Sequence, residues 1–326
     1  MSVKTVDIST INQTTADELL ECASRDGFLF VEGSGFTQKE VDDMFNMSKG
    51  FFALPLEEKN KFPIGAENRG YNAINVETLD PATQKKGDPK EGFNFGKYIN
   101  EKPIQPMPEF FQKPENADII ANMQTKLYNL SQRILKLLAM GLKIDESSGG
   151  SNWFADRHRR DYPSGSIFRL LYYPGQKKAD PEDEIRAGAH TDYGSLTLLF
   201  QREGEEGLEI LSPVSKKWEP VPYVGPKEPG MAPPVVVNIG DLLSYWTAGI
   251  LKSTIHRVKF PAKLQAEGTD RYSCVFFCHP EEEVRLEPVP SAKIASVTGR
   301  GANEGKVITA EEHLQSRLSA TYGWKK

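Results

Sequence analysis

Short apolar runs spaced along the second half of the chain constrain its fold more than any other feature. Glycine, proline and charged residues separate the runs, so each run predicts a strand. Many short strands at near-regular spacing are typical of a β-sandwich or jelly roll. We therefore predict a jelly-roll core over residues 165–300. The runs are 167–173, 196–201, 208–211, 235–239, 242–246, 254–260 and 272–278.

The first 150 residues predict helices instead. Apolar residues at helical period give the longest one, roughly Glu115 to Gly141. A Thr followed three residues later by Glu is a capping-box spacing, which predicts a helix start. We expect one α+β domain over 1–326, with a helix-rich region (1–150), the core, and a last helix (309–322). The capping pairs are Thr15 with Glu18, Thr37 with Glu40, and Thr309 with Glu312.

Charge and cysteine content exclude several function classes. The formal net charge of −5 leaves no basic excess to neutralise phosphates, so nucleic acid is not an expected partner. No apolar stretch is long enough for a membrane span, and residues 1–7 lack the pattern of a secretory signal. Three scattered cysteines are too few for a disulfide framework. We expect a monomeric protein of the reducing cytoplasm.

The segment His190-Thr191-Asp192 suggests a metal site, because side chains at i and i+2 of a strand share one face. With His256 from a later strand, these residues would form the 2-His-1-carboxylate face that holds non-haem Fe(II). Taken singly, a hydrogen-bonded structural histidine or a turn aspartate is an ordinary alternative. Their joint presence favours the metal. We leave three histidines out of the ligand set: His158, His279 and His313.

Arg271 and Ser273 form a second i, i+2 pair, on an apolar strand. A guanidinium binds a carboxylate through two parallel hydrogen bonds, and the serine hydroxyl can add a donor from the same face. Charged hydrogen bonds of this kind are worth about 1.5–3 kcal/mol each, enough to select a dicarboxylate over a simple keto acid. The alternative for Arg271 is a surface salt bridge with Asp270 or a glutamate. The predicted metal site and the carboxylate-binding pair together indicate an oxygenase.

With these residues in place, the chain resembles the isopenicillin N synthase-like branch of the Fe(II)/2-oxoglutarate-dependent dioxygenases over nearly its full length. Within that branch it is similar to fungal thymine 7-hydroxylase-like enzymes, through 68–71, 186–188 and 271–273. The matching segments are 27–31, 35–36, 51–55, 57–59, 69–71, 90–93, 169–174, 238–243 with Trp246, 252–258 and 312–322.

The resemblance implies a jelly-roll enzyme in which His190, Asp192 and His256 bind Fe(II). 2-Oxoglutarate would chelate the metal and place its far carboxylate on Arg271 and Ser273. O2 would complete the site, giving succinate, CO2 and a hydroxylated, desaturated or cyclised small molecule. Leu171 stands where plant members carry Asn, so Tyr173 is the expected second co-substrate contact. The expected substrate pocket is formed by Arg69, Tyr71, Phe93, Tyr173, Trp246 and Phe277, with His279 as a further candidate.

Phe277 could stack on a flat substrate, although a core aromatic on a strand is an equally ordinary interpretation. Two rival functions stay open at this point. One is an Fe(II) oxidase that needs no 2-oxoglutarate, since isopenicillin N synthase and the ethylene-forming plant oxidases also carry an Arg-x-Ser pair. The other is a non-catalytic jelly-roll protein that has kept a metal site. The substrate itself could be a nucleobase, an amino acid, a terpenoid or a polyketide.

Overall fold

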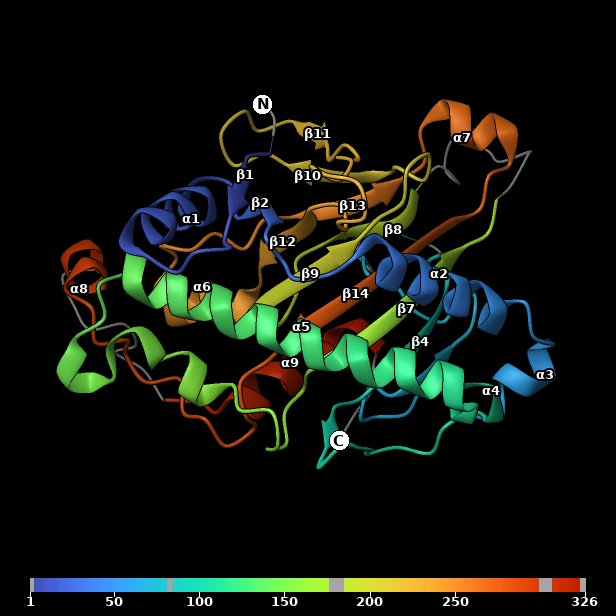
Figure 1. The fold of residues 1–326 in the computed structure, drawn as a ribbon, viewed down its shortest axis with the longest axis horizontal. Helices are drawn as coiled ribbons and strands as arrows, with labels where there is room; N and C mark the ends of the chain where they lie inside the picture. Colours follow the sequence, from blue (N-terminus) through green and yellow to red (C-terminus); the bar gives the residue numbers. More distant parts are fainter. Residues whose placement is uncertain (1–2, 81–83, 85, 176–184, 299–306, 323–326) are drawn as a thin grey trace.

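Two β-sheets form the centre of the computed structural model, which describes residues 3–80, 84, 86–175, 185–298 and 307–322 (Figure 1). In the larger sheet, only the pairing of its first two strands is parallel. Its strands, in pairing order, are β1 (Thr5–Asp7), β2 (Phe28–Glu32), β12 (Val235–Ile239), β9 (Leu196–Phe200), β14 (Arg271–Cys278), β7 (Ile167–Tyr173), β4 (Glu91–Phe95) and β3 (Gly70–Asn72). The smaller, antiparallel sheet contains β11 (Trp218–Pro220), β10 (Leu208–Leu211), β13 (His256–Lys259) and β8 (Ile185–His190). The α+β jelly-roll prediction is confirmed.

Alternation along β14 shows how the sheets are packed. Tyr272, Cys274, Phe276 and Cys278 belong to the core beneath the helices, whereas Arg271, Ser273, Val275 and Phe277 line a cavity between the two sheets. This is the period of two that a strand imposes on its side chains. A small apolar cluster closes the space between the sheets around the cavity: Leu171, Tyr173, Ala187, Val258, Phe260 and Val275.

Three helices cover the outer face of the larger sheet: α1 (Gln13–Arg25), α2 (Gln38–Phe52) and α5 (Pro114–Gly141) (Figure 1). The capping box predicted for α2 is confirmed, since Thr37 and Glu40 exchange both hydrogen bonds. The one predicted at Thr15 is wrong. Helix α1 begins earlier, because the side chain of Asn12 accepts the bond from the Thr15 amide.

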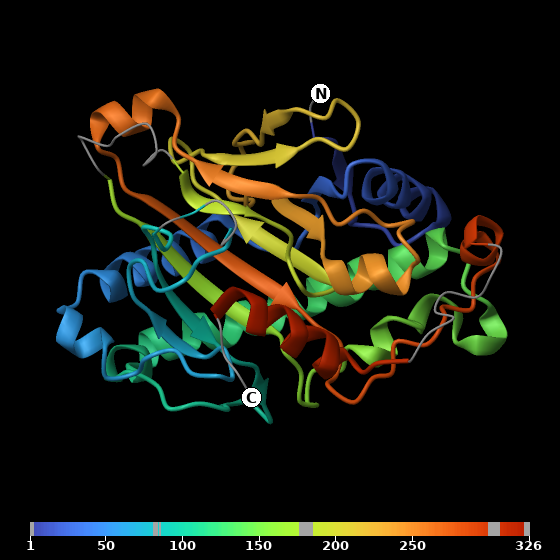
Figure 2. The same ribbon diagram turned by 180° about the vertical axis from the view of Figure 1, so that it is seen from behind.

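A shorter helix, α9 (Ala310–Tyr322), lies on the opposite side of the molecule from α5 (Figure 2). The run 242–246, predicted as a strand, belongs to helix α6 (Asp241–Trp246). Its buried residues Leu242, Leu243 and Trp246 are spaced at one and four positions, which fits a helix better than a strand. The other short elements are α3 (Leu56–Lys59), β5 (Tyr98–Ile99), β6 (Lys102–Pro103), α4 (Glu109–Gln112), α7 (Ala262–Glu267) and α8 (Ala292–Thr298), with 3₁₀ turns at 146–148, 150–152 and 155–157.

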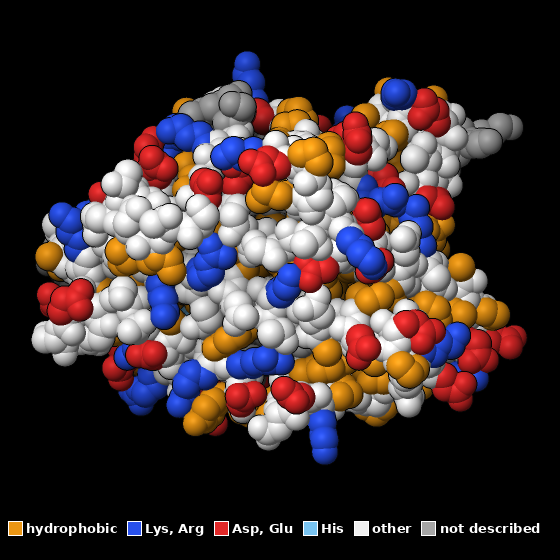
Figure 3. All heavy atoms as spheres, viewed as in Figure 1, with side chains coloured by type: hydrophobic (Ala, Val, Ile, Leu, Met, Phe, Trp, Pro, Cys, Tyr) orange, Lys and Arg blue, Asp and Glu red, His pale blue; other side chains and the backbone are white. Residues whose placement is uncertain are grey.

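The surface carries both signs of charge. On the face that shows α5, basic and acidic side chains are interspersed (Figure 3). None of the helices among the described residues combines the length and the apolar character needed to cross a bilayer. The three cysteines are free and buried.

Candidate active site

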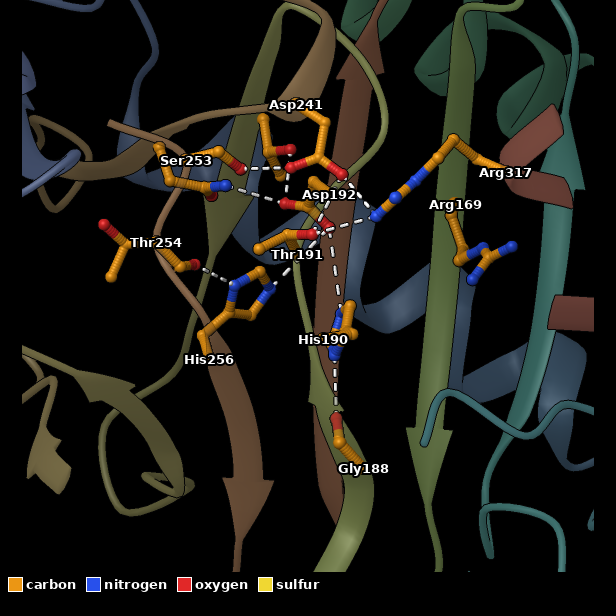
Figure 4. A network of polar contacts seen from close by, with 12 residues as sticks. Arg169, Gly188, His190, Thr191, Asp192, Asp241, Ser253, Thr254, His256 and Arg317 are labelled. Atoms are coloured by element: carbon orange, nitrogen blue, oxygen red, sulfur yellow. Dashed lines mark hydrogen bonds and ion pairs between the residues drawn. The ribbon is translucent and has the colours of Figure 1, made fainter. Parts of the chain in front are cut away.

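The side chains of His190, Asp192 and His256 converge at one end of the space between the sheets (Figure 4). Their potential ligand atoms all lie within 4.8 Å of one another. Asp192 Oδ1 is 3.8 Å from His190 Nε2 and 3.6 Å from His256 Nε2. The two histidines are direct partners across β8 and β13. Asp192 lies just beyond the end of β8, in the turn toward β9, and not on the strand as the i, i+2 argument assumed.

Hydrogen bonds around these residues fix what each presents to a metal. His190 Nδ1 is 2.8 Å from Gly188 O, and His256 Nδ1 is 3.1 Å from Thr254 O (Figure 4). Because a carbonyl only accepts, each Nδ1 carries the proton and each Nε2 keeps its lone pair for a ligand bond. Asp192 Oδ2 accepts from the Thr197 hydroxyl at 2.6 Å and from the Asn238 amide at 2.7 Å. The other oxygen, Oδ1, is the one directed to the histidines.

The ionisation states suit a divalent cation. Burial, together with the neighbouring His256, lowers the pKa of His190 to about 4, so this ring is neutral at physiological pH. Burial alone would raise the pKa of Asp192, but the two histidines and the two hydrogen bonds lower it, so it is a carboxylate. Two imidazole Nε2 atoms and one carboxylate are a donor set that fits Fe(II).

Arg271 and Ser273 lie in the wall of the same cavity. Arg271 is only 1% exposed, and its Nε donates to the Glu205 carbonyl at 2.9 Å. In the described part of the chain, Arg271 Nη1 and the Ser273 hydroxyl have no hydrogen-bond partner. Buried donors without partners are costly, so this pair fits a bound anion. The alternative interpretation of Arg271, a surface salt bridge, is wrong, because the side chain is buried and Asp270 accepts hydrogen bonds from Tyr172 and Gly175.

Comparison with known proteins decides the family. Residues 3–116 match the model described as the N-terminal region of non-haem dioxygenases of morphine synthesis, and residues 164–280 match the 2OG-Fe(II) oxygenase superfamily. The chain belongs to the 2OG-Fe(II) oxygenases. It is 31% identical to clavatol oxidase claD of Penicillium crustosum, over 91% of this chain and 87% of that protein. A UPF0676 protein of Schizosaccharomyces pombe is 32% identical, over 99% and 94%.

Among solved structures, thymine 7-hydroxylase of Neurospora crassa, in complex with alpha-ketoglutarate and thymine, superposes with a TM-score of 0.79 at 28% identity. The match covers 98% of this chain and 96% of that one. The family resemblance is thereby confirmed. The protein is a 2-oxoglutarate-dependent oxidoreductase of the dioxygenase type that acts on a small molecule.

The oxygenase cavity has an empty volume of about 940 Å³, including its mouth. Of the predicted pocket residues, Tyr173 and Phe277 line it, and so does His279. Tyr173 also faces Arg271, whose guanidinium lies 5.0 Å from the centre of its ring.

The other four predicted pocket residues lie elsewhere, so that part of the prediction is wrong. Tyr71 and Phe93 are paired across β3 and β4 and belong to the core under the helices, so strand alternation turns both away from the cavity. Trp246 is fully buried against Trp153 and donates to the Glu287 carbonyl. Arg69 pairs with Glu67 and lines a neighbouring pocket, which shares His279, Leu314 and Leu318 with the cavity.

The sequence did not predict two parts of the cavity wall. Arg169 shares a face of β7 with Leu171 and Tyr173, so the period of two could have found it. Glu77 and Lys90 come from the connection between β3 and β4, where no periodic pattern marks them.

Helix α9 covers part of the cavity, a role that the sequence did not predict. Leu314 and Leu318, four residues apart and therefore on one helix face, line the cavity. Between them Arg317 forms an ion pair with Asp241 at 2.5 Å and donates to the Thr191 hydroxyl at 3.2 Å (Figure 4). Thr191 stands between two of the proposed metal ligands, so α9 is attached directly to the metal-binding turn.

Proposed function

We propose that this enzyme couples oxidative decarboxylation of 2-oxoglutarate, to succinate and CO2, with insertion of oxygen into a C–H bond of a small organic substrate. Fe(II) is held by His190, Asp192 and His256, and the far carboxylate of 2-oxoglutarate by Arg271 and Ser273. The observation that carries the proposal is the pair of buried donors without partners, Arg271 Nη1 and the Ser273 hydroxyl, in the same cavity as the triad.

When bound, Fe(II) supplies the chemistry of O2 activation, and the keto acid supplies two of the four electrons that O2 takes up. The chain's own residues orient the reactants. Thr197 and Asn238 hold one oxygen of Asp192, which leaves the other for the metal. Arg271 is fixed by the Glu205 carbonyl, so its free edge is already in place for a carboxylate. Leu314 and Leu318 help to exclude water from the cavity.

Tyr173 is proposed as a further co-substrate contact, because its ring lies against the Arg271 guanidinium. Phe277 is proposed as a substrate contact from the same wall. Thymine 7-hydroxylase and clavatol oxidase differ in the molecules that their names specify, so family membership alone does not choose the substrate. A monomeric, single-domain, cytoplasmic protein remains our proposal, supported for the compartment by three free, buried cysteines.

The test is an anaerobic titration with Fe(II), with and without 2-oxoglutarate, that monitors the visible charge-transfer band of the metal–keto acid chelate. We expect a band that needs both components, and succinate when O2 is admitted. The control variant Asp192→Ala should give no band. O2 consumption without the band or succinate would favour the 2-oxoglutarate-independent oxidase, and a metal complex that gives no product of any kind would favour the non-catalytic alternative.

A further inference from the structure

Besides Arg271 and Ser273, which have donors without partners among the described residues, the cavity contains a second group of ionisable side chains that are paired with one another. Lys90 Nζ lies 2.8 Å from Glu77 Oε2 and 2.7 Å from Asp88 Oδ2. Arg169 Nη1 lies 3.2 Å from Glu77 Oε1, and its Nε donates to Asn94 Oδ1 at 2.6 Å. Glu77, Lys90 and Arg169 line the cavity directly. We call Glu77, Asp88, Lys90 and Arg169 the charge-balanced wall.

The wall is buried, and Lys90 keeps its charge there. Lys90 and Glu77 are each 3% exposed and Asp88 is 0% exposed. Burial alone would lower the pKa of Lys90, but the attraction of Glu77 and Asp88 raises it, so the lysine stays protonated. Asp88 is also held by the Gly188 amide at 2.9 Å, two residues before the ligand His190. The wall therefore has a fixed position relative to the metal site.

The ionised groups among the described lining residues divide into three sets. Asp192 is committed to the metal, and Arg271 to the co-substrate. Burial lowers the pKa of His279 to about 3, so this lining residue is neutral. The remaining charged lining residues are Glu77, Lys90 and Arg169, and Asp88, which pairs with Lys90, completes two cations and two anions. An ion brought in by the substrate would lose its hydration and meet no uncommitted countercharge on these residues, which strongly disfavours its binding.

We propose that the primary substrate is uncharged in the part that enters the cavity, and that the charge-balanced wall is the determinant that rejects ionised analogues. The inference rests on the proposed function, because it assigns Asp192 and Arg271 to the metal and the keto acid. An uncharged, hydrogen-bonding molecule suits this cavity, since polar groups of the wall lie beside apolar side chains such as Leu171, Val275 and Phe277. Free amino acids and organic acids are disfavoured by the same argument.

The test is calorimetric binding of matched probes to the anaerobic enzyme loaded with Fe(II) and 2-oxoglutarate. One set is thymine with uracil-5-carboxylate, and the other is 4-propylphenol with tyramine and 4-hydroxyphenylacetate. The wild type should bind at least one uncharged probe, and bind it about tenfold or more tightly than its charged counterparts. Charged probes that bind as tightly as the uncharged ones, or a panel in which no uncharged probe binds, would overturn the proposal.

Variants that change the net charge of the wall in either direction test whether the preference follows that charge. Glu77→Gln leaves a net positive wall and should move the preference about tenfold toward the carboxylate probes. Lys90→Met leaves a net negative wall and should move it by a similar factor toward tyramine. The double variant restores neutrality, so it should restore the wild-type preference. Single variants that fold but leave the preference unchanged would contradict the wall's role.

Two controls separate the possible failures. Melting temperature shows whether each variant is folded, and the double variant shows whether a lost preference comes from charge or from local damage. The charge-transfer band reports the metal and 2-oxoglutarate independently of the probes. A normal band with no discrimination by charge refutes the wall alone, whereas absence of the band refutes the proposed function.

Discussion

Replacing Arg271 with glutamine is the sharpest test of the co-substrate site. The structure gives the size of the effect, because Arg271 Nη1 is a buried charged donor with no partner among the described residues. A hydrogen bond between a charged donor and a carboxylate contributes about 1.5–3 kcal/mol. At about 1.4 kcal/mol per factor of ten, Arg271→Gln should raise the KM for 2-oxoglutarate roughly 10- to 150-fold. Ser273→Ala removes a neutral donor worth about 1 kcal/mol, so the increase should be about fivefold.

The assay is succinate release as a function of 2-oxoglutarate concentration, with kcat and KM separated. An alternative co-substrate, 2-oxopentanoate, has a methyl group where 2-oxoglutarate has its far carboxylate. Because it yields butanoate instead of succinate, CO2 release is the measurement that compares the two keto acids. The wild type should strongly prefer 2-oxoglutarate, and Arg271→Gln should lose most of that preference. Arg271→Lys keeps the charge without the planar fork, so its KM should be intermediate. A folded Arg271→Gln enzyme whose KM and preference stay within about threefold of wild type would show that the carboxylate binds elsewhere.

Other variants test the metal, the cover and the stability. Asp192→Ala should abolish turnover and one-to-one Fe(II) binding, and full iron-dependent activity in this variant would disprove the ligand assignment. Arg317→Ala removes the ion pair to Asp241, so amide hydrogen exchange in α9 should accelerate, while Gln315→Ala on the same helix should change it little. Burial lowers the pKa of His158 to about 4, from an ordinary 6.5, so the unfolded chain takes up a proton that the folded protein does not. The contribution of neutral His158 to the free energy of unfolding is therefore complete above pH 6.5 and declines by up to about 3 kcal/mol toward pH 4. Urea unfolding at several pH values should show a flatter pH dependence of this free energy for His158→Gln.

Local periodicity accounts for the parts of the site that the sequence predicted. Arg271 and Ser273 alternate with core residues along a single strand, so one register places both in the cavity. The stripe of α5 and the capping box at Thr37 are equally local signals. For residues 242–246 the same reasoning failed, because a short apolar run fits a buried strand and a buried helix turn alike. The expected pocket role of Trp246 failed as well, since its indole packs against Trp153 and donates to the Glu287 carbonyl.

Long-range contacts account for what the sequence could not predict. Glu77 and Arg169 are 92 residues apart, and no spacing rule connects a loop carboxylate to a strand guanidinium. Lys90 belongs to a segment that matches the family, but its ion pair with Glu77 spans an irregular connection in which no periodic pattern brings the two residues together. The bond from the Gly188 amide to Asp88 joins positions 100 residues apart. The attachment of α9 through Arg317 likewise joins positions 126 residues apart.

Residues proposed to bind the metal and 2-oxoglutarate lie mainly on strands, whereas Glu77 and Lys90 of the charge-balanced wall lie on a connection. His190, His256 and Arg271 lie on strands whose register is fixed by ladder hydrogen bonds, so displacing any of them disturbs a sheet. Glu77 and Lys90 lie outside the strands, on a connection that can accept substitution without altering a ladder. A change of charge there alters what the cavity accepts and leaves the metal and the pair of Arg271 and Ser273 intact. Enzymes that share the triad can therefore differ in substrate through a few residues of this connection.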